Sequence, residues 1–173
     1  MKAIDEPTFY PRKRKERLIS MIETRPEWCV SRQRVWGVPL PIFVNKKTKE
    51  ILVDDDVFEI IAKIYEKEGS DCWFSDDPQK FLGKKYKAED FEKLSDIVEV
   101  WFDSGSTHSF VLEKRKDLKW PASMYLEGSD QHRGWFHSSL LQSCGTRGKA
   151  PFESILSHGF VAVSYTHLTL PTT

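Results

Sequence analysis

The most constraining feature of the sequence is a repeated pattern of short apolar runs in its last third. Residues 124–148, MYLEGSDQHRGWFHSSLLQSCGTRG, read as a short strand, a polar turn and a helix over about 131–145. A further apolar run, FESILSHGFV at 152–161, ends at a His-Gly pair. Strand, loop, helix and strand in this order are typical of a βαβ unit. The sequence therefore predicts an α/β fold with a parallel sheet.

An earlier run, DIVEVWFDSGSTHS, begins at Asp96 and is rich in β-branched residues before it reaches Asp, Ser and Gly. We interpret it as another strand that leads into a loop. Ligands of parallel sheets bind beyond the carboxyl ends of the strands. The polar residues that follow these runs are therefore candidates for one site: Asp103, Glu127, Asp130 and His158.

The N-terminal part of the chain gives shorter signals. Residues 1–10 show no periodicity and are interpreted as irregular. Apolar spacing predicts an amphipathic helix over about 12–24 that ends before Pro26, since a residue preceding proline is disfavoured in a helix. Its basic cluster is interpreted as a solvated helix face. Two prolines exclude a helix from 27–44, which we expect to be extended.

The middle of the chain carries one strong helix signal. Residues 51–53 suggest a short strand, and the segment that follows has an acidic start, apolar residues at helical spacing and a closing Gly69. These features predict a helix over about 56–68. Residues 70–95 are charged and rich in turn formers, and we interpret them as a small surface module.

Composition excludes several classes of protein. Lys and Arg number 26, as do Asp and Glu, so the formal net charge is zero. This balance argues against a chain that holds a polyanion by bulk charge alone. Hydrophobic residues are 39% and charged residues 30%, which argues against global disorder. No apolar stretch approaches the ~20 residues that cross a bilayer, and the first residues do not resemble a secretory signal. Three widely spaced cysteines fit a reducing cytoplasm.

The segment EGSDQHRGW, residues 127–135, has two interpretations. Glu127 at a strand end can hold a ligand ammonium, and Gly128 lets a ligand approach the backbone. Asp130 can instead be only a helix N-cap. The spacing alone leaves both interpretations open.

Two other kinds of site are less consistent with the pattern. His132 and His137 are five residues apart, so at ~100° per residue they diverge by about 140° around a helix, and we expect no protein-built metal site. Ser104, Ser106 and His108 are candidates for a hydrolase. No Gly-x-Ser-x-Gly motif is present, and close sequence neighbours rarely form a catalytic triad.

A second candidate surface is SRQRVWG at 31–37. Arg32, Gln33, Arg34 and Trp36 combine cations, an amide and a flat ring, a mixture that can hold phosphate and stack a base of a single-stranded end. The alternative is a hairpin with salt-bridged arginines, and from the residues alone that alternative is favoured.

Four strings together resemble the isoleucyl-tRNA synthetases, a family of class I aminoacyl-tRNA synthetases. They are RPEWCVSRQRVWGVPLP, WFDSGSTH, YLEGSDQHRGWF and GKAPFESILSHGF. The resemblance extends from about Arg17 to Val161 and is weakest between 44 and 95. It implies the second half of a Rossmann-type parallel-sheet catalytic domain with a small α+β insertion, and hence an incomplete domain.

The resemblance also implies a domain organisation. Residues 1–43 correspond to the return segment from an editing insertion, residues 44–95 to a small insertion module, and residues 96–161 to the second half of the catalytic domain. Residues 162–173 depart from the family pattern, and we expect them to be a non-native tail. A chain with half of its ATP site missing is expected to form no adenylate by itself.

Site roles follow from the same resemblance. Glu127 corresponds to the residue that holds the isoleucyl-adenylate through the ammonium, and with Asp130 and Gln131 it forms the expected catalytic set. Trp101 and Trp135 correspond to two walls of the isoleucine pocket. The residues implied around the aminoacyl-adenylate are Trp101, Asp103, Glu127, Gly128, Asp130, Gln131, Trp135, His158, Gly159 and Phe160. The resemblance also implies that Arg32, Gln33, Arg34 and Trp36 neighbour the tRNA acceptor end.

The implied reaction is ATP-dependent ligation of isoleucine to its tRNA through an isoleucyl-adenylate. The implied partners are isoleucine, ATP with Mg²⁺ as its substrate complex, and tRNA, with no membrane and no protein-bound metal in this chain. The family also implies a cytoplasmic, monomeric enzyme. The main alternative is a non-catalytic synthetase-like module that binds tRNA or a nucleotide.

Overall fold

The computed structural model describes residues 2–25 and 27–161. The chain divides into two compact units, one formed from 1–27 with 104–173 and the other from 28–103. Each unit has its own hydrophobic core. Among the described residues, no helix is both long enough and apolar enough to cross a membrane.

The first unit contains a three-stranded parallel sheet in the order β1-β7-β6. Its elements in chain order are η1 (Lys2–Ile4), β1 (Thr8–Tyr10), α1 (Arg14–Glu23), η3 (His108–Leu112), β6 (Tyr125–Gly128), η4 (Ser129–Arg133), α6 (Trp135–Arg147) and β7 (Ser154–His158). The β6–α6–β7 succession confirms the predicted parallel sheet. Strand β1 lies in a segment predicted to be irregular, and it pairs with β7 across most of the chain.

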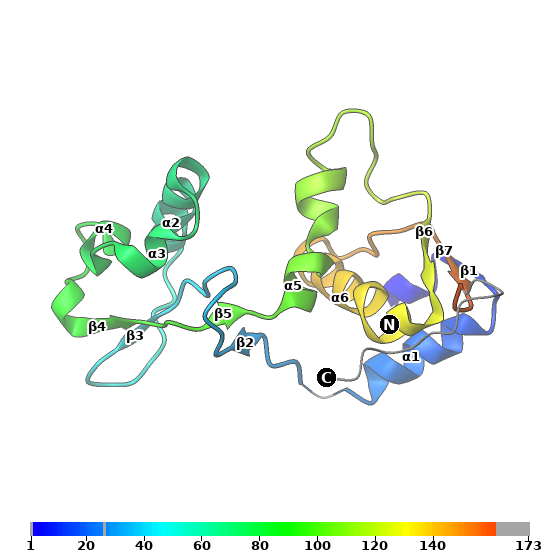
Figure 1. The fold of residues 1–173 in the computed structure, drawn as a ribbon, viewed down its shortest axis with the longest axis horizontal. Coiled ribbons are helices and arrows are strands. Elements are labelled where there is room, and N and C mark those ends of the chain that lie inside the picture. Colours follow the sequence, from blue (N-terminus) through cyan, green and yellow to red (C-terminus); the bar gives the residue numbers. More distant parts are fainter. Residues whose placement is uncertain (1, 26, 162–173) are drawn as a thin grey trace. The chain divides into compact units, whose positions relative to one another are not determined.

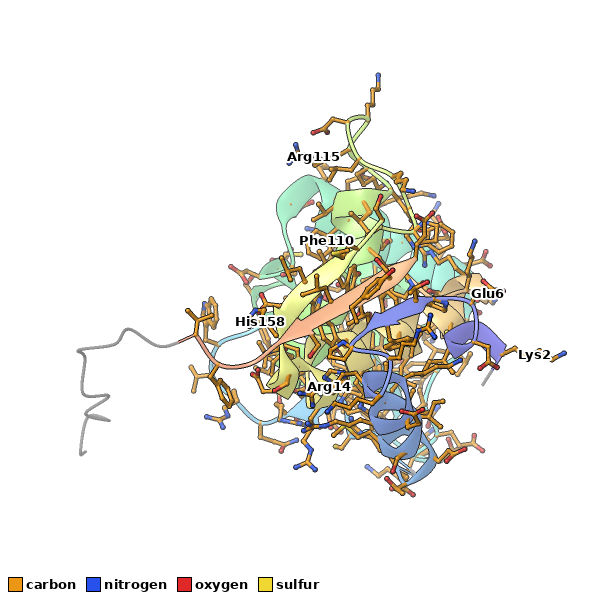
Figure 2. All side chains as sticks on the ribbon, turned by 90° about the vertical axis from the view of Figure 1, so that its right-hand side faces the viewer. Lys2, Glu6, Arg14, Phe110, Arg115 and His158 are labelled. Carbon is orange, nitrogen blue, oxygen red and sulfur yellow. The ribbon has the colours of Figure 1, made fainter. Side chains whose placement is uncertain are left out.

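The core of the first unit lies between the sheet and its helices. Helix α6 lies on one side of the strands in Figure 1 and behind them in Figure 2. Tyr125, Ile155 and Phe136 are almost completely buried there. On the opposite face, Leu126 and Tyr10 are exposed, and both lie in register with Leu156. One sheet face therefore supplies the core while the other presents an apolar row.

Close packing against α6 requires a glycine at position 105. Gly105 is the last residue of helix α5 (Val100–Gly105) and belongs to the first unit, because the division between the two units falls within this helix. A Cβ added at Gly105 would lie 2.9 Å from the backbone carbon of Ser138 and 2.4 Å from the Gln142 amide nitrogen. Because real Cβ atoms do not approach backbone this closely, the glycine of the WFDSG motif fixes the approach of the chain to α6.

The second unit is a small α+β module with two two-stranded sheets. Its elements are β2 (Ser31–Arg32), β3 (Phe43–Asn45), α2 (Asp55–Glu68), α3 (Cys72–Ser75), α4 (Pro78–Leu82), η2 (Ala88–Asp90), β4 (Phe91–Lys93) and β5 (Ile97–Val98). Strand β2 pairs with β5 and β3 pairs with β4, both antiparallel. Residues 51–53 form only an isolated bridge, from Ile51 to Val44.

Helix α2 begins and ends close to its predicted limits, because both ends have capping residues. Asp54 accepts hydrogen bonds from the backbone N–H groups of Asp56 and Val57, which a helix start leaves without partners. The hydrogen bonds that Asp54 receives from Lys85 and Tyr86 hold its pKa at about 2. Gly69 follows the last turn at φ 84°, and its N–H donates to the Tyr65 carbonyl.

Residues 70–95 are more than the surface module expected from their charge. They supply most of the second core, including Trp73, Phe81 and Leu82, which are fully buried. The Trp73 ring lies 5.0 Å from the rings of both Phe43 and Phe81. The prediction was wrong here because helices of four and five residues are too short to show a periodic apolar pattern.

The run that begins at Asp96 is also different from the prediction. Only Ile97 and Val98 form a strand, and this strand pairs antiparallel with β2 instead of joining the parallel sheet. Helix α5 starts at Val100, so Asp103 lies on a helix and not in a loop. β-Branched residues favour strands only weakly, and the tertiary surroundings decided otherwise.

The predicted limits at 43/44 and 95/96 differ from the contact-based limits of the two units, 27/28 and 103/104. The limits at 43/44 and 95/96 come from the resemblance to a longer protein family, and they stay predictions. The proposed non-native tail, 162–173, lies outside the described residues.

Three buried histidines in the first unit lead to a prediction about acid stability. Burial lowers the pKa of His108, His132 and His137 below the ordinary value of 6.5. The unfolded chain therefore binds protons at a higher pH than the folded chain. We expect the free energy of unfolding to decrease as pH falls below about 6.5, by up to about 1.4 kcal/mol per pH unit for each histidine still neutral in the folded state.

Urea unfolding at pH 7.5, 6.5 and 5.5, followed by tryptophan fluorescence, measures this dependence. The His137→Gln variant should show a shallower decrease than the unchanged protein, since it has one fewer buried imidazole to protonate. A free energy of unfolding that stays constant down to pH 5.5 contradicts the prediction.

Candidate active site

The carboxyl ends of two parallel strands bring three predicted site residues together. In the register of β6 and β7, Glu127 lies opposite Ser157 and Gly128 lies opposite His158. The Glu127 side chain is exposed, and its Oε2 accepts a hydrogen bond from the Gly128 N–H at 3.3 Å. Figure 2 shows His158 at this end of the sheet. The exposed carboxylate is therefore available to a ligand at a strand end, where parallel sheets bind their ligands.

Gly128 leaves space at this strand end for the Asp130 side chain. The backbone angle of Gly128, φ −64°, is open to any residue, but a Cβ there would lie 2.6 Å from Asp130 Oδ1. The Asp130 carboxylate thus lies against the backbone of the strand end. From the sequence we expected this space to admit a ligand, and the structure instead places a carboxylate there.

Gln131 links the acidic turn to the following helix. Its amide nitrogen donates to Asp130 Oδ2 at 3.0 Å, and its amide oxygen accepts the backbone N–H of Trp135 at 3.0 Å. The second hydrogen bond satisfies one of the N–H groups that the start of α6 leaves without a helical partner. The Gln131 side chain therefore fixes the Asp130 carboxylate relative to α6.

Trp135 is held as a fixed, half-buried plane. Its ring stacks on Tyr125 with centroids 4.0 Å apart and planes 5° apart. Its indole N–H donates to the Ser104 carbonyl at 3.1 Å. A rigid aromatic side chain of this kind can form one wall of an apolar pocket. Tyr125, which the sequence did not single out, supports it from β6, and burial raises the pKa of Tyr125 to about 12.

His132 also supports the site, although the sequence analysis considered it only as a metal ligand. It is fully buried, its Nδ1 lies 3.0 Å from the Ser129 carbonyl, and its ring meets Phe136 edge-on at 5.3 Å. Burial lowers its pKa, with smaller contributions from Arg17 and Arg14. A neutral His132 thus fixes the 3₁₀ turn η4, which carries Asp130 and Gln131. In the sequence, only the four-residue spacing between His132 and Phe136 indicates that these two side chains pack together.

The chain after β7 is open to solvent. Gly159 is exposed and the Phe160 side chain is 83% exposed, while His158 is half-buried with its Nδ1 2.5 Å from the Gly159 carbonyl. These residues continue from the strand end that carries the Glu127 and Gly128 pair. Their expected place around the aminoacyl-adenylate stays a prediction.

The remaining predicted residues belong to the second unit. Trp101 is 40% exposed and Asp103 half-buried, both on α5. Burial raises the pKa of Asp103, with a smaller contribution from the nearby Glu99. Trp101 and Trp135 lie in different units, so their sharing of one pocket stays a prediction.

The SRQRVWG segment has features of both of its interpretations. Trp36 is 90% exposed and Arg34 is exposed. Gln33 donates to Asp96 at 3.0 Å, and Arg32 lies 3.8 Å from Glu99. The ion-paired arginine of the second interpretation is therefore present, but its strand β2 pairs with β5 and not within a hairpin. Beside this ion pair lie an exposed ring and a second cation.

The residues considered for other chemistry are placed differently. His108 is buried, with its Nδ1 3.0 Å from the Gly105 carbonyl and no hydrogen-bond partner at Nε2. This arrangement offers no base for a serine nucleophile. Within 2–25 and 27–161, no group of three or more His, Cys, Asp or Glu side chains is arranged to hold a metal ion.

Comparison with known protein families decides the classification. The model of the family described as tRNA synthetases class I (I, L, M and V) matches residues 1–165. The chain belongs to this class I tRNA synthetase family. The predicted resemblance is confirmed, and the three parallel strands with α6 fit part of the Rossmann-type domain expected for it.

Individual class I synthetases are also closely similar. The chain is 81% identical over 161 residues to the isoleucine–tRNA ligase of Pelagibacter ubique, a match that covers 93% of this chain and 18% of that protein. It is 54% identical to the isoleucine–tRNA ligase of Zymomonas mobilis and 58% identical to that of Brucella abortus, covering 92% of this chain in both cases and 17% and 16% of those proteins. The chain therefore spans less than a fifth of the length of these relatives.

Proposed function

We propose that this chain is part of an enzyme that ligates isoleucine to its tRNA through an isoleucyl-adenylate. The observation that carries the proposal is the β6 end, where an exposed Glu127 carboxylate, the Gly128–Asp130 contact and the fixed Trp135 ring follow one another along the chain. Membership of the class I synthetase family and the high identity to isoleucine–tRNA ligases support it.

In the first step, the isoleucine carboxylate attacks the α-phosphorus of ATP, and pyrophosphate leaves with the electron pair of the broken P–O bond. The nucleophile is already ionised, so no general base is needed and catalysis rests on positioning and charge stabilisation. Glu127 holds the ammonium of isoleucine, and Gly128 with Asp130 holds the ribose. Gln131 lies beside the amino acid, and Trp101 and Trp135 enclose its side chain.

In the second step, a terminal hydroxyl of tRNA attacks the adenylate carbonyl, and AMP leaves. His158, Gly159 and Phe160 lie along the adenosine, and Asp103 supports the site from α5. Arg32, Gln33, Arg34 and Trp36 contact the acceptor end, where an exposed ring can stack on a base. We assign no residue of this chain to the Mg²⁺ that accompanies ATP.

The three cysteines are free thiols, which fits our proposal of a cytoplasmic enzyme. Its action as a monomer stays a prediction.

Isoleucine-dependent exchange of pyrophosphate into ATP tests the proposed reaction. A full-length enzyme that carries this segment should catalyse exchange with isoleucine and much less with leucine or methionine. If exchange is absent while tRNA binds with a steep dependence on salt, the alternative of a non-catalytic binding module is correct and the proposal is wrong.

The contact between Gly128 and Asp130 gives a further prediction. In the Gly128→Ala variant, the new Cβ would displace the Asp130 carboxylate and break its hydrogen bond to Gln131. Loss of one hydrogen bond from the ribose to a charged group costs about 1.5–3 kcal/mol. We therefore expect the KM for ATP in pyrophosphate exchange to rise by about tenfold or more, with little change in the melting temperature.

Gly145→Ala is the matched control for this variant. Gly145 lies on α6, and a Cβ there would meet no atom within 4 Å. The control should keep the KM for ATP of the unchanged enzyme. An unchanged KM in Gly128→Ala would remove Asp130 from the ATP site.

A further inference from the structure

Glu99 is a buried carboxylate that the proposed reaction does not use. It lies between β5 and α5, and the whole residue is 6% exposed. Its backbone N–H donates to the Val30 carbonyl at 2.8 Å, which continues the pairing of β5 with the β2 segment. A buried carboxylate is costly unless hydrogen bonds and an opposite charge compensate it. The contacts of Glu99 therefore indicate its role.

The first set of contacts fixes the start of α5. Glu99 Oε2 accepts the backbone N–H of Trp101 at 3.1 Å. Its carbonyl oxygen accepts the N–H groups of Phe102 at 2.8 Å and Asp103 at 3.3 Å. The side chain thus satisfies an N–H of the first turn, as an N-cap does. The residue whose N–H is held in this way is Trp101, the proposed wall of the isoleucine pocket.

The second contact holds a cation. Arg32 Nη2 lies 3.8 Å from Glu99 Oε1, and the other terminal nitrogen, Nη1, donates to the carbonyls of Cys29 at 2.7 Å and Ser31 at 2.8 Å. The guanidinium is therefore fixed by its own strand on one side and by the Glu99 charge on the other. Arg32 is one of the residues proposed to contact the tRNA acceptor end.

The contact between Glu99 and Arg32 borders a hollow within the second unit. The hollow has a volume of about 330 Å³. Its lining includes Arg32, Arg34, Trp36, Glu99 and Asp103. Glu99 thus lies where the residues proposed for tRNA meet the helix that carries Trp101. A single carboxylate contacts both groups, through different oxygens.

We propose that Glu99 is a positioning residue for both steps, one oxygen orienting Trp101 for isoleucine and the other orienting Arg32 for the tRNA acceptor end. This inference rests on the proposed function. Because the two oxygens make different kinds of contact, two substitutions separate their effects. An amide at position 99 keeps an acceptor oxygen for the Trp101 N–H and loses the negative charge next to Arg32. A methyl group loses both.

The test uses Glu99→Gln, Glu99→Ala and the control Glu92→Gln in a full-length enzyme that carries this segment. Glu92 is an exposed carboxylate on β4 of the same unit. Pyrophosphate exchange gives the KM for isoleucine, and aminoacylation gives the KM for tRNA. For Glu99→Gln we expect the KM for tRNA to rise at least fivefold, and the KM for isoleucine to change less than twofold. For Glu99→Ala both KM values should rise at least fivefold.

Several outcomes overturn the inference. An unchanged KM for tRNA in Glu99→Gln excludes the role toward Arg32, and an equal rise of both KM values in that variant indicates a general structural effect. If Glu99→Ala fails to fold, the nearly isosteric Glu99→Gln still decides the first point, and Glu99→Asp, which shortens the reach to Trp101, replaces Ala for the second. Absence of isoleucine-dependent exchange in the unchanged enzyme would instead contradict the proposed function.

Discussion

Replacing Glu127 with Ala in a full-length enzyme that carries this segment should lower kcat/KM for isoleucine-dependent pyrophosphate exchange by about two to three orders of magnitude. An ammonium about 4 Å from a carboxylate gains about 4 kcal/mol at an effective dielectric constant near 20, before desolvation is subtracted. Each 1.4 kcal/mol corresponds to a factor of ten. Because Glu127 is exposed and its described hydrogen bond is a local one to Gly128, the fold should tolerate the change.

Exchange rates over a range of isoleucine concentrations, together with a melting curve, measure both effects. Glu153→Ala is the control, since Glu153 is an exposed carboxylate just before β7 that pairs with Lys119 at 2.8 Å. The Glu127→Gln variant keeps the shape of the side chain and should still lose most of the activity. Near-normal exchange by Glu127→Ala would mean that the ammonium is held elsewhere.

Replacing Trp73 with Ala should destabilise the second unit by about 3–5 kcal/mol, the usual cost of removing a large aromatic side chain from a core. Trp73 is fully buried between Phe43 and Phe81. Its indole N–H donates to the Leu94 carbonyl at 2.8 Å, so the substitution also leaves a partly buried acceptor without this partner. The loss is large for a unit with one small core.

Hydrogen exchange of the full-length enzyme locates this loss. Amides of residues 28–103 should exchange faster in Trp73→Ala, while those of 104–161 should change less. The neighbouring Phe74 is 47% exposed, so Phe74→Ala should have a much smaller effect. Equal loss of protection throughout both ranges would show that the units do not unfold separately.

The sequence predicted the elements with local signals. Helix α2 has an N-capping Asp54 and a closing Gly69, and both are adjacent to it in the chain. The β6–α6–β7 unit was predictable because its turn and its two apolar runs are close together. The same proximity placed Glu127 and His158 correctly at the strand ends of one sheet.

The elements that were missed depend on distant partners. Strand β1 has three residues and its partner is the distant β7, so Thr8 and Phe9 carry no local pattern. Helix α5 starts after β-branched residues because the buried Glu99 accepts an N–H of its first turn. In the site, the contact of Asp130 with Gly128 and the stacking of Tyr125 on Trp135 depend on side-chain geometry, which residue spacing does not specify.

The pairing of β1 with β7 has a consequence for the order of events on the ribosome. Residues 8–10 of β1 emerge from the exit tunnel long before residues 154–158 of β7, their partner in the sheet. The contiguous unit 28–103 has all of its chain available first, so we expect it to fold during synthesis. The first unit must wait for its last strand, and until then the apolar face of Phe9 and Leu18 remains without its partners. Nascent chains that stall before residue 154 should accordingly be the ones that chaperones capture.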